Sequence, residues 1–346
     1  SMTSGGTESL FLATKTYRDQ ARKERPHITA PEMLLPTTAH PALLKSAHYL
    51  NVRPVLIPPG PDFRADVAAM ERAITPQTLF LVGSAPAYPH GVVDPIESLS
   101  ALAQKHSLPL HVDACVGGFT LPFVRKAGHP VPPFDFTVPG VTSISADLHK
   151  YGFAAKGAST VLYRTPALRR HQFYVYSGWP GGLFGSATVL GTRPGGAIAA
   201  AWASLQSLGE EGFLRIAKTI MATTQKLMDG ISAIPELFVL GKPDCGVFAF
   251  ASHGPDLMAI ADQMEERGWH IDRQQFPTAI HLTITPAHAP VADRYLSDLR
   301  ECVAHIVAHP ELAAQGVAAM YGMLMHIPDP SMVDEFILSN FDSMYR

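Results

Sequence analysis

The sequence predicts an α/β protein in which a mostly parallel sheet carries helices on both of its faces. Four short apolar runs are typical of strands that are buried on both sides. The runs cover residues 79–82, 110–112, 142–145 and 160–163. Residues 95–106, between the first two runs, have the spacing of an amphipathic helix. This strand–helix–strand order is the repeating unit of a parallel sheet.

The remaining periodic segments predict two domains. A helix is expected over residues 8–25, ending before Pro26, and further helices over 197–208 and 212–231. The last third of the chain alternates between the two kinds of pattern. Strands are expected at 238–240, 247–251 and 280–284, and helices near 256–267 and 291–308. We therefore expect a large domain over residues 1–205 and a smaller α/β domain over 206–346, with the boundary near 205–235.

Composition indicates an enzyme-like globule. The 346 residues are 47% hydrophobic and only 16% charged, which argues against disorder. A net charge of −3 without a basic block argues against a nucleic-acid partner. No apolar run is long enough for a membrane span, and the start has no signal-peptide pattern. The three cysteines, Cys115, Cys245 and Cys302, are too few and too scattered for a disulfide framework. A cytoplasmic enzyme is the expectation.

Two charged residues follow predicted strands. Lys150 ends the segment Ser-Ala-Asp-Leu-His-Lys, and Asp113 ends another apolar run. Both would lie at the carboxyl edge of the sheet, where ligands bind in open α/β proteins. A lysine there can form a Schiff base with pyridoxal 5′-phosphate (PLP), and an aspartate can keep the pyridine nitrogen protonated. Taken singly, Lys150 is also compatible with a surface lysine and Asp113 with a helix cap.

Three further features agree with a cofactor site. Ser4-Gly5-Gly6-Thr7 runs into the first helix, and such a glycine loop can bring helix N–H groups to a phosphate. His40 could stack on a cofactor ring, and Arg193 could clamp a carboxylate or phosphate; a structural role is the alternative for each. Dinucleotide, Walker, serine-hydrolase and metal-ligand motifs are absent, so no metal site is expected.

These motifs, in this order, resemble those of the PLP-dependent group II decarboxylases, and within them the sphingosine-1-phosphate lyase branch. The resemblance runs nearly end to end. Its most specific parts lie at residues 88–95, 112–119, 141–157 and 191–196, with weaker matches at 321–323 and 342–345. It implies the aspartate aminotransferase-like fold (fold type I) of PLP-dependent transferases, and a homodimer with shared active sites.

The resemblance also implies a role for each site residue. Lys150 is expected to carry PLP as a Schiff base, Asp113 to pair with its ring nitrogen, and His40 and Cys115 to lie on opposite ring faces. Other cofactor contacts are expected from Gly6, Thr7, His149, Ser84 and, from the second subunit, Thr192. The substrate is expected to meet Lys156 and His90. Lys156, in Lys-Tyr-Gly-x-x-x-Lys-Gly, would bind a substrate phosphate. A solvated lysine is the alternative.

The implied reaction is cleavage of phosphorylated sphingoid bases between C2 and C3, which gives a long-chain aldehyde and phosphoethanolamine. The base that deprotonates the C3 hydroxyl stays open among a phosphate oxygen, His90 and a tyrosine of a preceding segment. That segment is expected to be missing here, because the chain enters its glycine loop without a leading strand or helix. An amino-acid decarboxylase, or a PLP-binding protein without turnover, is the alternative function.

Overall fold

The computed structural model describes residues 1–316 and 330–345, so the resemblance at 321–323 lies outside the described residues. The chain divides into two compact units, each described here by itself. Unit 1 comprises residues 1–224 and 241–248, and unit 2 comprises residues 225–240 and 249–346. The segment in which the sequence places a domain boundary, residues 205–235, is mostly helical. It belongs largely to α7 (Gly195–Ser232), which is interrupted at Gly209 by a non-helical backbone (φ 55°, ψ −176°).

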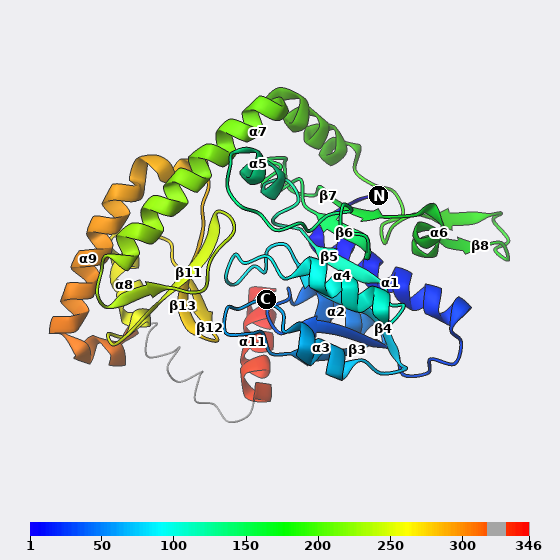
Figure 1. Cartoon of the computed structure of the whole chain (residues 1–346), viewed down its shortest axis with the longest axis horizontal. Helices are drawn as coiled ribbons and strands as arrows, with labels where there is room; N and C mark the ends of the chain where they lie inside the picture. The colour runs from blue at the N-terminus through cyan, green and yellow to red at the C-terminus, as the bar shows by residue number, and fades with distance from the viewer. Residues whose placement is uncertain (317–329, 346) are drawn as a thin grey trace. The chain divides into compact units, whose positions relative to one another are not determined.

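The described part of unit 1 is built on a seven-stranded sheet with the strand order β1-β7-β6-β5-β4-β2-β3 (Figure 1). In chain order the strands are β1 (Met2–Thr3), β2 (Glu32–Pro36), β3 (Arg53–Ile57), β4 (Thr78–Ser84), β5 (Leu110–Asp113), β6 (Val141–Ala146) and β7 (Ser159–Tyr163). Strands β2 to β6 pair in parallel, whereas β7 is antiparallel to both β6 and β1. The prediction of a mostly parallel sheet is therefore confirmed.

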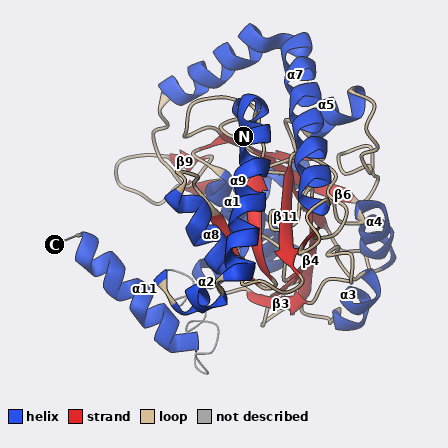
Figure 2. Ribbon diagram, turned by 90° about the vertical axis from the view of Figure 1, so that its left-hand side faces the viewer, coloured by secondary structure: helices blue, strands red, loops and turns tan. Residues whose placement is uncertain are grey.

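Helices cover both faces of this sheet. Helix α1 (Gly6–Glu24) contacts β4, β6, β7 and α2 (Ala42–Leu50). Helix α3 (Val67–Ala73) contacts β2 and β3, and α4 (Ile96–Lys105) contacts β4 and β5. Figure 2 shows α3 and α4 on one side of the sheet and α2 on the other. The buried face of α1 explains its helical spacing, because Leu10, Tyr17 and Ala21 join one apolar core with residues of β2, α2 and β4.

Several short elements of unit 1 have no clear sequence signal. They are α5 (Leu121–Lys126), α6 (Pro166–Arg169), the 3₁₀ turn η1 (Arg170–Gln172) and the hairpin β8 (Tyr174–Tyr176) to β9 (Phe184–Ser186). The expectation that no strand precedes the glycine loop was wrong. The two residues of β1 pair with Thr160 and Ser159 of β7, and a strand this short carries no periodic pattern.

Unit 2 is a smaller α/β body. Its four-stranded sheet has the order β10-β11-β13-β12. The strands are β10 (Leu237–Val239), β11 (Val247–Ser252, whose first two residues belong to unit 1), β12 (Asp272–Gln275) and β13 (Thr278–Thr283). The helices are α8 (Leu257–Glu266), η2 (Pro286–Val291), α9 (Ala292–Ala308), η3 (Pro310–Ala314) and α11 (Pro330–Met344). Helix α8 packs on β13 and α9.

Within residues 1–316 and 330–345, every helix is too short or too polar to cross a membrane.

Candidate active site

Unit 1 has a pocket at the carboxyl edge of its sheet, with a volume of about 370 Å³. We call it the strand-end pocket. Asp113 ends β5, Lys150 follows β6, and His40 follows β2. Because β1 runs in the same direction as these strands, the loop after β1 reaches the same edge. The lining residues are Ser4, Gly5, Gly6, Thr7, Glu8, Leu10, His40, Asp113, Cys115, Asp147, His149 and Lys150.

The glycine loop brings the start of α1 to this pocket. Gly5 precedes the helix and no side chain caps it, so the first N–H groups of α1 lack the usual side-chain partner. Gly6 has no room for a side chain. A Cβ atom there would lie 2.8 Å from Oδ2 of Asp147 and 3.0 Å from Sγ of Cys115. The loop therefore presents bare backbone donors and a helix dipole to the pocket, an arrangement that suits an anion.

Asp113 is held as a carboxylate inside the protein. Its Oδ1 accepts hydrogen bonds from the Cys115 backbone N (3.0 Å) and the Ser145 hydroxyl (3.2 Å). Burial alone would raise the pKa of Asp113, but the hydrogen bonds from Cys115 and the charge of Lys150 hold it below its ordinary value. Asp113 can thus supply a fixed negative charge to a bound ring nitrogen.

Lys150 is paired with a second carboxylate. Its Nζ lies 2.8 Å from Oδ2 of Asp147, which is 1% exposed. Burial alone would lower the pKa of Lys150, but the charges of Asp147 and Asp113 hold it above its ordinary value. The amine is therefore an ammonium at neutral pH while this pair is intact.

Two histidines of the pocket are oriented by backbone donors. The N–H of Ala42 donates to Nδ1 of His40 (3.1 Å), and the N–H of Ala158 donates to Nδ1 of His149 (3.2 Å). Each Nδ1 is therefore an acceptor, which places the ring proton on Nε2. Burial lowers the pKa of both imidazoles, so neutral rings line the pocket at pH 7.

Two pocket residues, Asp147 and Glu8, were not assigned a role from the sequence. Asp147 precedes Lys150 by three residues, and this spacing brings the two side chains together in one turn. Buried Glu8 accepts hydrogen bonds from the backbone N and hydroxyl of Ser4 (2.6 Å each). It also accepts from the backbone N of Val189 (2.9 Å) and Leu190 (3.4 Å). The signal for Glu8 is an acidic residue in the first turn of a helix, which is too common to be specific.

The structure brings most of the predicted site residues together. Gly6, Thr7, His40, Asp113, Cys115, His149 and Lys150 all line the strand-end pocket. Four predicted residues are not part of its lining: Ser84, His90, Lys156 and Thr192.

Each of these four residues has surroundings of its own. Ser84 and His90 are buried, and His90 stacks on Phe63 with 4.1 Å between ring centroids. Lys156 and Thr192 are exposed. The charge of Lys156 nevertheless acts on His149, whose pKa it helps to lower after the larger effect of burial.

The pocket residues suit the groups of PLP. An uncapped helix start with a glycine cradle suits a phosphate, and a buried carboxylate with a depressed pKa suits a pyridinium nitrogen. Lys150 Nζ is within the same lining, as an imine-forming amine would need to be. The donor set therefore fits this cofactor.

Comparisons with known proteins agree with this description. The pyridoxal-dependent decarboxylase conserved domain matches residues 2–253. The chain is 49% identical over 344 residues to the sphingosine-1-phosphate lyase of Arabidopsis thaliana, covering 99% of this chain and 63% of that protein. It is 44% identical over 347 residues to sphingosine-1-phosphate lyase 1 of Rattus norvegicus, covering 99% of this chain and 61% of that protein. The chain thus spans a little under two thirds of these curated relatives.

Solved structures extend the comparison. A sphingosine-1-phosphate lyase of Burkholderia pseudomallei is 42% identical with a TM-score of 0.87, covering 95% of this chain and 75% of that one. A glutamate decarboxylase of Lactobacillus brevis is 17% identical with a TM-score of 0.77, covering 88% of this chain and 74% of that one. The second likeness concerns the fold alone, and both agree with the expected fold type.

Proposed function

The chain belongs to the pyridoxal-dependent decarboxylase family, and from this premise we propose that it binds PLP in the strand-end pocket and cleaves phosphorylated sphingoid bases. The products would be a long-chain aldehyde and phosphoethanolamine. The observation that carries the proposal is one pocket that joins the start of α1, a low-pKa aspartate and a lysine. The choice of substrate rests on relatives named sphingosine-1-phosphate lyases, of which the chain spans about 63% in Arabidopsis.

Each part of the pocket has one task in this proposal. Backbone N–H groups at Gly6 and Thr7, together with His149, hold the cofactor phosphate. Asp113 keeps the ring nitrogen protonated, and the neutral His40 ring stacks on the cofactor. Lys150 would hold the cofactor covalently through Nζ. Cys115 lies beside Gly6 and limits the space on that side.

Bound PLP supplies an electron sink for the pair of electrons that remains at C2 when the C2–C3 bond breaks. A base removes the proton from the C3 hydroxyl, the C3–O bond becomes a carbonyl, and the aldehyde leaves. Lys150 would return a proton to C2. The negative charge of Asp113 opposes deprotonation of the ring nitrogen during the whole reaction. The ring therefore keeps its capacity to accept electrons.

Lys156 is proposed to attract the substrate phosphate. It is exposed and close enough to the strand-end pocket for its charge to act on His149. A flexible ammonium at the margin of a site suits a phosphate that approaches from solvent. The base for the C3 hydroxyl stays open, with His90, a substrate phosphate oxygen and a residue from another chain segment as candidates. Ser84 and Thr192 remain proposed cofactor contacts.

We also propose a homodimer with shared active sites. The exposed hairpin β8–β9 carries Tyr174, Val175 and Tyr176, and its tip carries Trp179 and Leu183, an apolar surface that a second subunit would cover. Thr192 and Arg193 lie exposed beyond this hairpin, where they could serve a partner's site. Analytical ultracentrifugation tests this proposal, and a fully active monomer contradicts it.

The decisive experiment assays the protein, in its full natural length and loaded with PLP, on sphingosine 1-phosphate. Mass spectrometry follows the long-chain aldehyde and phosphoethanolamine. Lys150→Ala should abolish both products and the visible absorbance of lysine-bound cofactor, while Lys126→Ala, at an exposed position at the end of α5, should retain them. Release of CO2 from an amino acid without aldehyde formation would instead identify a decarboxylase. Cofactor binding without either reaction would identify a PLP-binding protein that does not turn over.

We propose a cytoplasmic location because the three cysteines are free thiols. Cys115, Cys245 and Cys302 are all free and buried, as is usual for proteins of reducing compartments. Fractionation of cells expressing the tagged full-length protein tests this location.

A further inference from the structure

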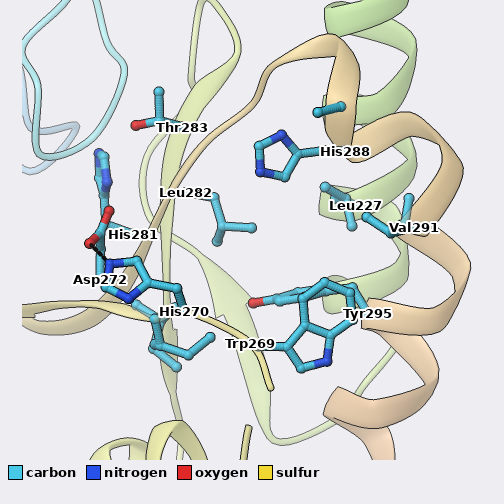
Figure 3. A pocket seen from close by; sticks show the side chains of 14 residues that line it. Leu227, Trp269, His270, Asp272, His281, Leu282, Thr283, His288, Val291 and Tyr295 are labelled. Atoms are coloured by element: carbon cyan, nitrogen blue, oxygen red, sulfur yellow. Dashed lines mark ion pairs between the residues drawn. The ribbon is translucent and has the colours of Figure 1, made fainter. Parts of the chain in front are cut away.

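Unit 2 contains a second cavity, of about 350 Å³, that the proposed reaction does not use. It lies between β13, the segment leading into β12, and the start of α9. Its walls are largely apolar and include Leu227, Ile280, Leu282, Val291 and Ala292. Figure 3 shows the side chains that surround it. Its volume falls in the range of small-molecule sites in proteins.

The hydroxyl of Tyr295 lines this cavity without a hydrogen-bond partner among residues 1–316 and 330–345. The residue is buried, at 7% exposed. In Figure 3 the hydroxyl is directed into the cavity rather than toward α9. Trp269 packs edge-on against the ring, with 5.1 Å between centroids and an interplanar angle of 86°. Burial raises the pKa of this phenol, so the group is a neutral donor at physiological pH.

A buried hydroxyl without a partner is costly. Such a group loses its water hydrogen bonds without replacing them. A single water in its place would need two to four polar partners. His288, which also lines the cavity, already uses Nδ1 as the acceptor for the backbone N of Thr285 (3.0 Å). An acceptor atom on a larger, mostly apolar molecule would satisfy the hydroxyl and fill the space together.

The charges of the lining residues limit which molecules can bind in this cavity. Within the part of the chain that the structure describes, no lysine or arginine lines the cavity. The acidic residue of the lining, Asp272, faces the exposed His270, with 3.6 Å between Oδ1 and Nε2. An anion would therefore enter without a permanent cation to receive it, and its burial would be unfavourable.

We propose that this cavity is a binding site for a small uncharged molecule that combines an apolar ring or chain with one oxygen acceptor. The Tyr295 hydroxyl donates a hydrogen bond to that oxygen, while Leu227, Leu282 and Val291 contact the apolar part. The residues that line this cavity belong to unit 2, whereas those that line the strand-end pocket belong to unit 1.

Fluorescence of Trp269 can report binding. Trp179 and Trp202 are exposed and can be replaced by Phe, which leaves Trp269 as the single tryptophan of the 346-residue chain. The PLP-loaded protein is titrated with benzyl alcohol. Toluene, which lacks the oxygen atom, is the comparison ligand, and benzoate is the anionic control. Benzyl alcohol should give a saturable change, and benzoate should give none.

Tyr295→Phe is the matched variant. It should weaken benzyl alcohol binding by about 2- to 12-fold, the effect of one lost hydrogen bond, and leave toluene binding unchanged. Its thermal midpoint should equal or exceed that of the parent protein, because the hydroxyl removed has no partner. The absorbance of lysine-bound cofactor should not change in this variant.

Three results would overturn the proposal. The first is no saturable response to benzyl alcohol up to its solubility limit. The second is equal affinity of the parent protein and Tyr295→Phe for benzyl alcohol. The third is a clear loss of thermal stability in Tyr295→Phe, which would show that the hydroxyl already has a partner inside the protein.

Discussion

The Nζ of Lys150 lies 2.8 Å from Oδ2 of Asp147, a buried carboxylate in the same turn of the chain. This pairing keeps the lysine charged, because the pKa of Lys150 lies above its ordinary value. Covalent capture of an aldehyde requires the neutral amine. On the proposed role of Lys150, Asp147 stabilises the unloaded protein in a form that must lose a proton before it can hold PLP.

Asp147→Asn should accelerate covalent loading of PLP at pH 7. Removing the carboxylate lowers the pKa of Lys150, and more of the amine is neutral at a given pH. Stopped-flow absorbance of lysine-bound cofactor should show a rate increase of about tenfold or more, the scale of one lost charge-assisted hydrogen bond. The loading rate of the parent should rise with pH through the neutral range, and the curve of the variant should lie at lower pH.

Glu71→Gln is a suitable control for that experiment. Glu71 pairs with Lys105 on the exposed surface, where its Oε1 lies 2.5 Å from Nζ, so its loss should not affect loading. A loading rate of Asp147→Asn equal to that of the parent at every pH would show that Asp147 does not control the protonation of Lys150.

Asp113→Asn should reduce kcat by about 10²- to 10³-fold, the scale expected for one preorganised electrostatic group. Its charge would no longer hold the proton on the ring nitrogen. Reconstitution with N-methyl-PLP, whose nitrogen carries a permanent positive charge, should restore part of the activity. Product formation measured with each cofactor checks this prediction.

The same cofactor analogue also shows which result would contradict a role for the charge of Asp113. If N-methyl-PLP gives Asp113→Asn no more activity than PLP does, the aspartate acts by packing rather than by its charge. Asp66→Asn, at the N-cap of α3, is a control that should leave kcat unchanged, because Asn caps a helix about as well as Asp.

The pocket could be predicted from the sequence where a residue follows a strong strand pattern. Asp113 and Lys150 follow apolar runs that became β5 and β6. The carboxyl ends of parallel strands meet at one edge, which made their proximity predictable. His40 follows β2, whose residues Glu32–Pro36 include a proline and have no alternating pattern, so the sequence left it open between a ring-stacking and a structural role.

Other parts of the site depend on tertiary contacts that have no local pattern. Glu8 joins the glycine loop to Val189 and Leu190, which lie 181 and 182 residues away in the chain. Helical spacing cannot show such a partner. The strand β1 was missed for the same reason, because two residues form a strand only through their pairing with β7.

Glu8→Gln should weaken PLP binding by about 5- to 150-fold. The amide can replace only part of the acceptor capacity that Ser4, Val189 and Leu190 use, and a buried donor left without a partner costs about 1–3 kcal/mol. The start of α1 and the loop near Val189 should then be less well ordered. Equilibrium titration with PLP, followed by absorbance, measures the effect.

Glu97→Gln is the matched control for Glu8→Gln, because Glu97 also lies in the first turn of a helix, α4, but is exposed. It should bind PLP like the parent. Equal PLP affinity of Glu8→Gln and the parent would mean that the hydrogen bonds of Glu8 do not support the cofactor site.

Lys156→Ala should raise KM for the phosphorylated substrate by about tenfold and leave PLP affinity unchanged. An exposed ammonium contributes to a phosphate contact mainly by charge, so Lys156→Arg should retain much of the affinity. Steady-state kinetics at low and high salt check this, since screening should weaken the parent more than the variant. An equal loss of PLP would instead make Lys156 a cofactor ligand.

Asp94 makes stability depend on pH. It is fully buried, and its two oxygens accept hydrogen bonds from the backbone N of Ser84 (2.7 Å) and Ala65 (2.8 Å). Burial raises the pKa of Asp94 to about 6. The folded protein therefore binds this proton more tightly than the unfolded chain, whose Asp has a pKa of about 3.9. The resulting stability is fully present below pH 4 and is lost as the pH rises through 6.

Asp94→Asn removes this titratable group. Comparing the variant with the parent protein should therefore isolate the contribution of Asp94 to stability. The variant should be less stable than the parent at both pH values, because its amide NH2 must face a backbone donor. The difference in the free energy of unfolding should shrink by about 1–1.5 kcal/mol between pH 5 and pH 7.5, as the parent loses the contribution of protonated Asp94. Urea unfolding at the two pH values measures this change. A difference that stays constant would show that Asp94 is ionised in the folded protein at both pH values.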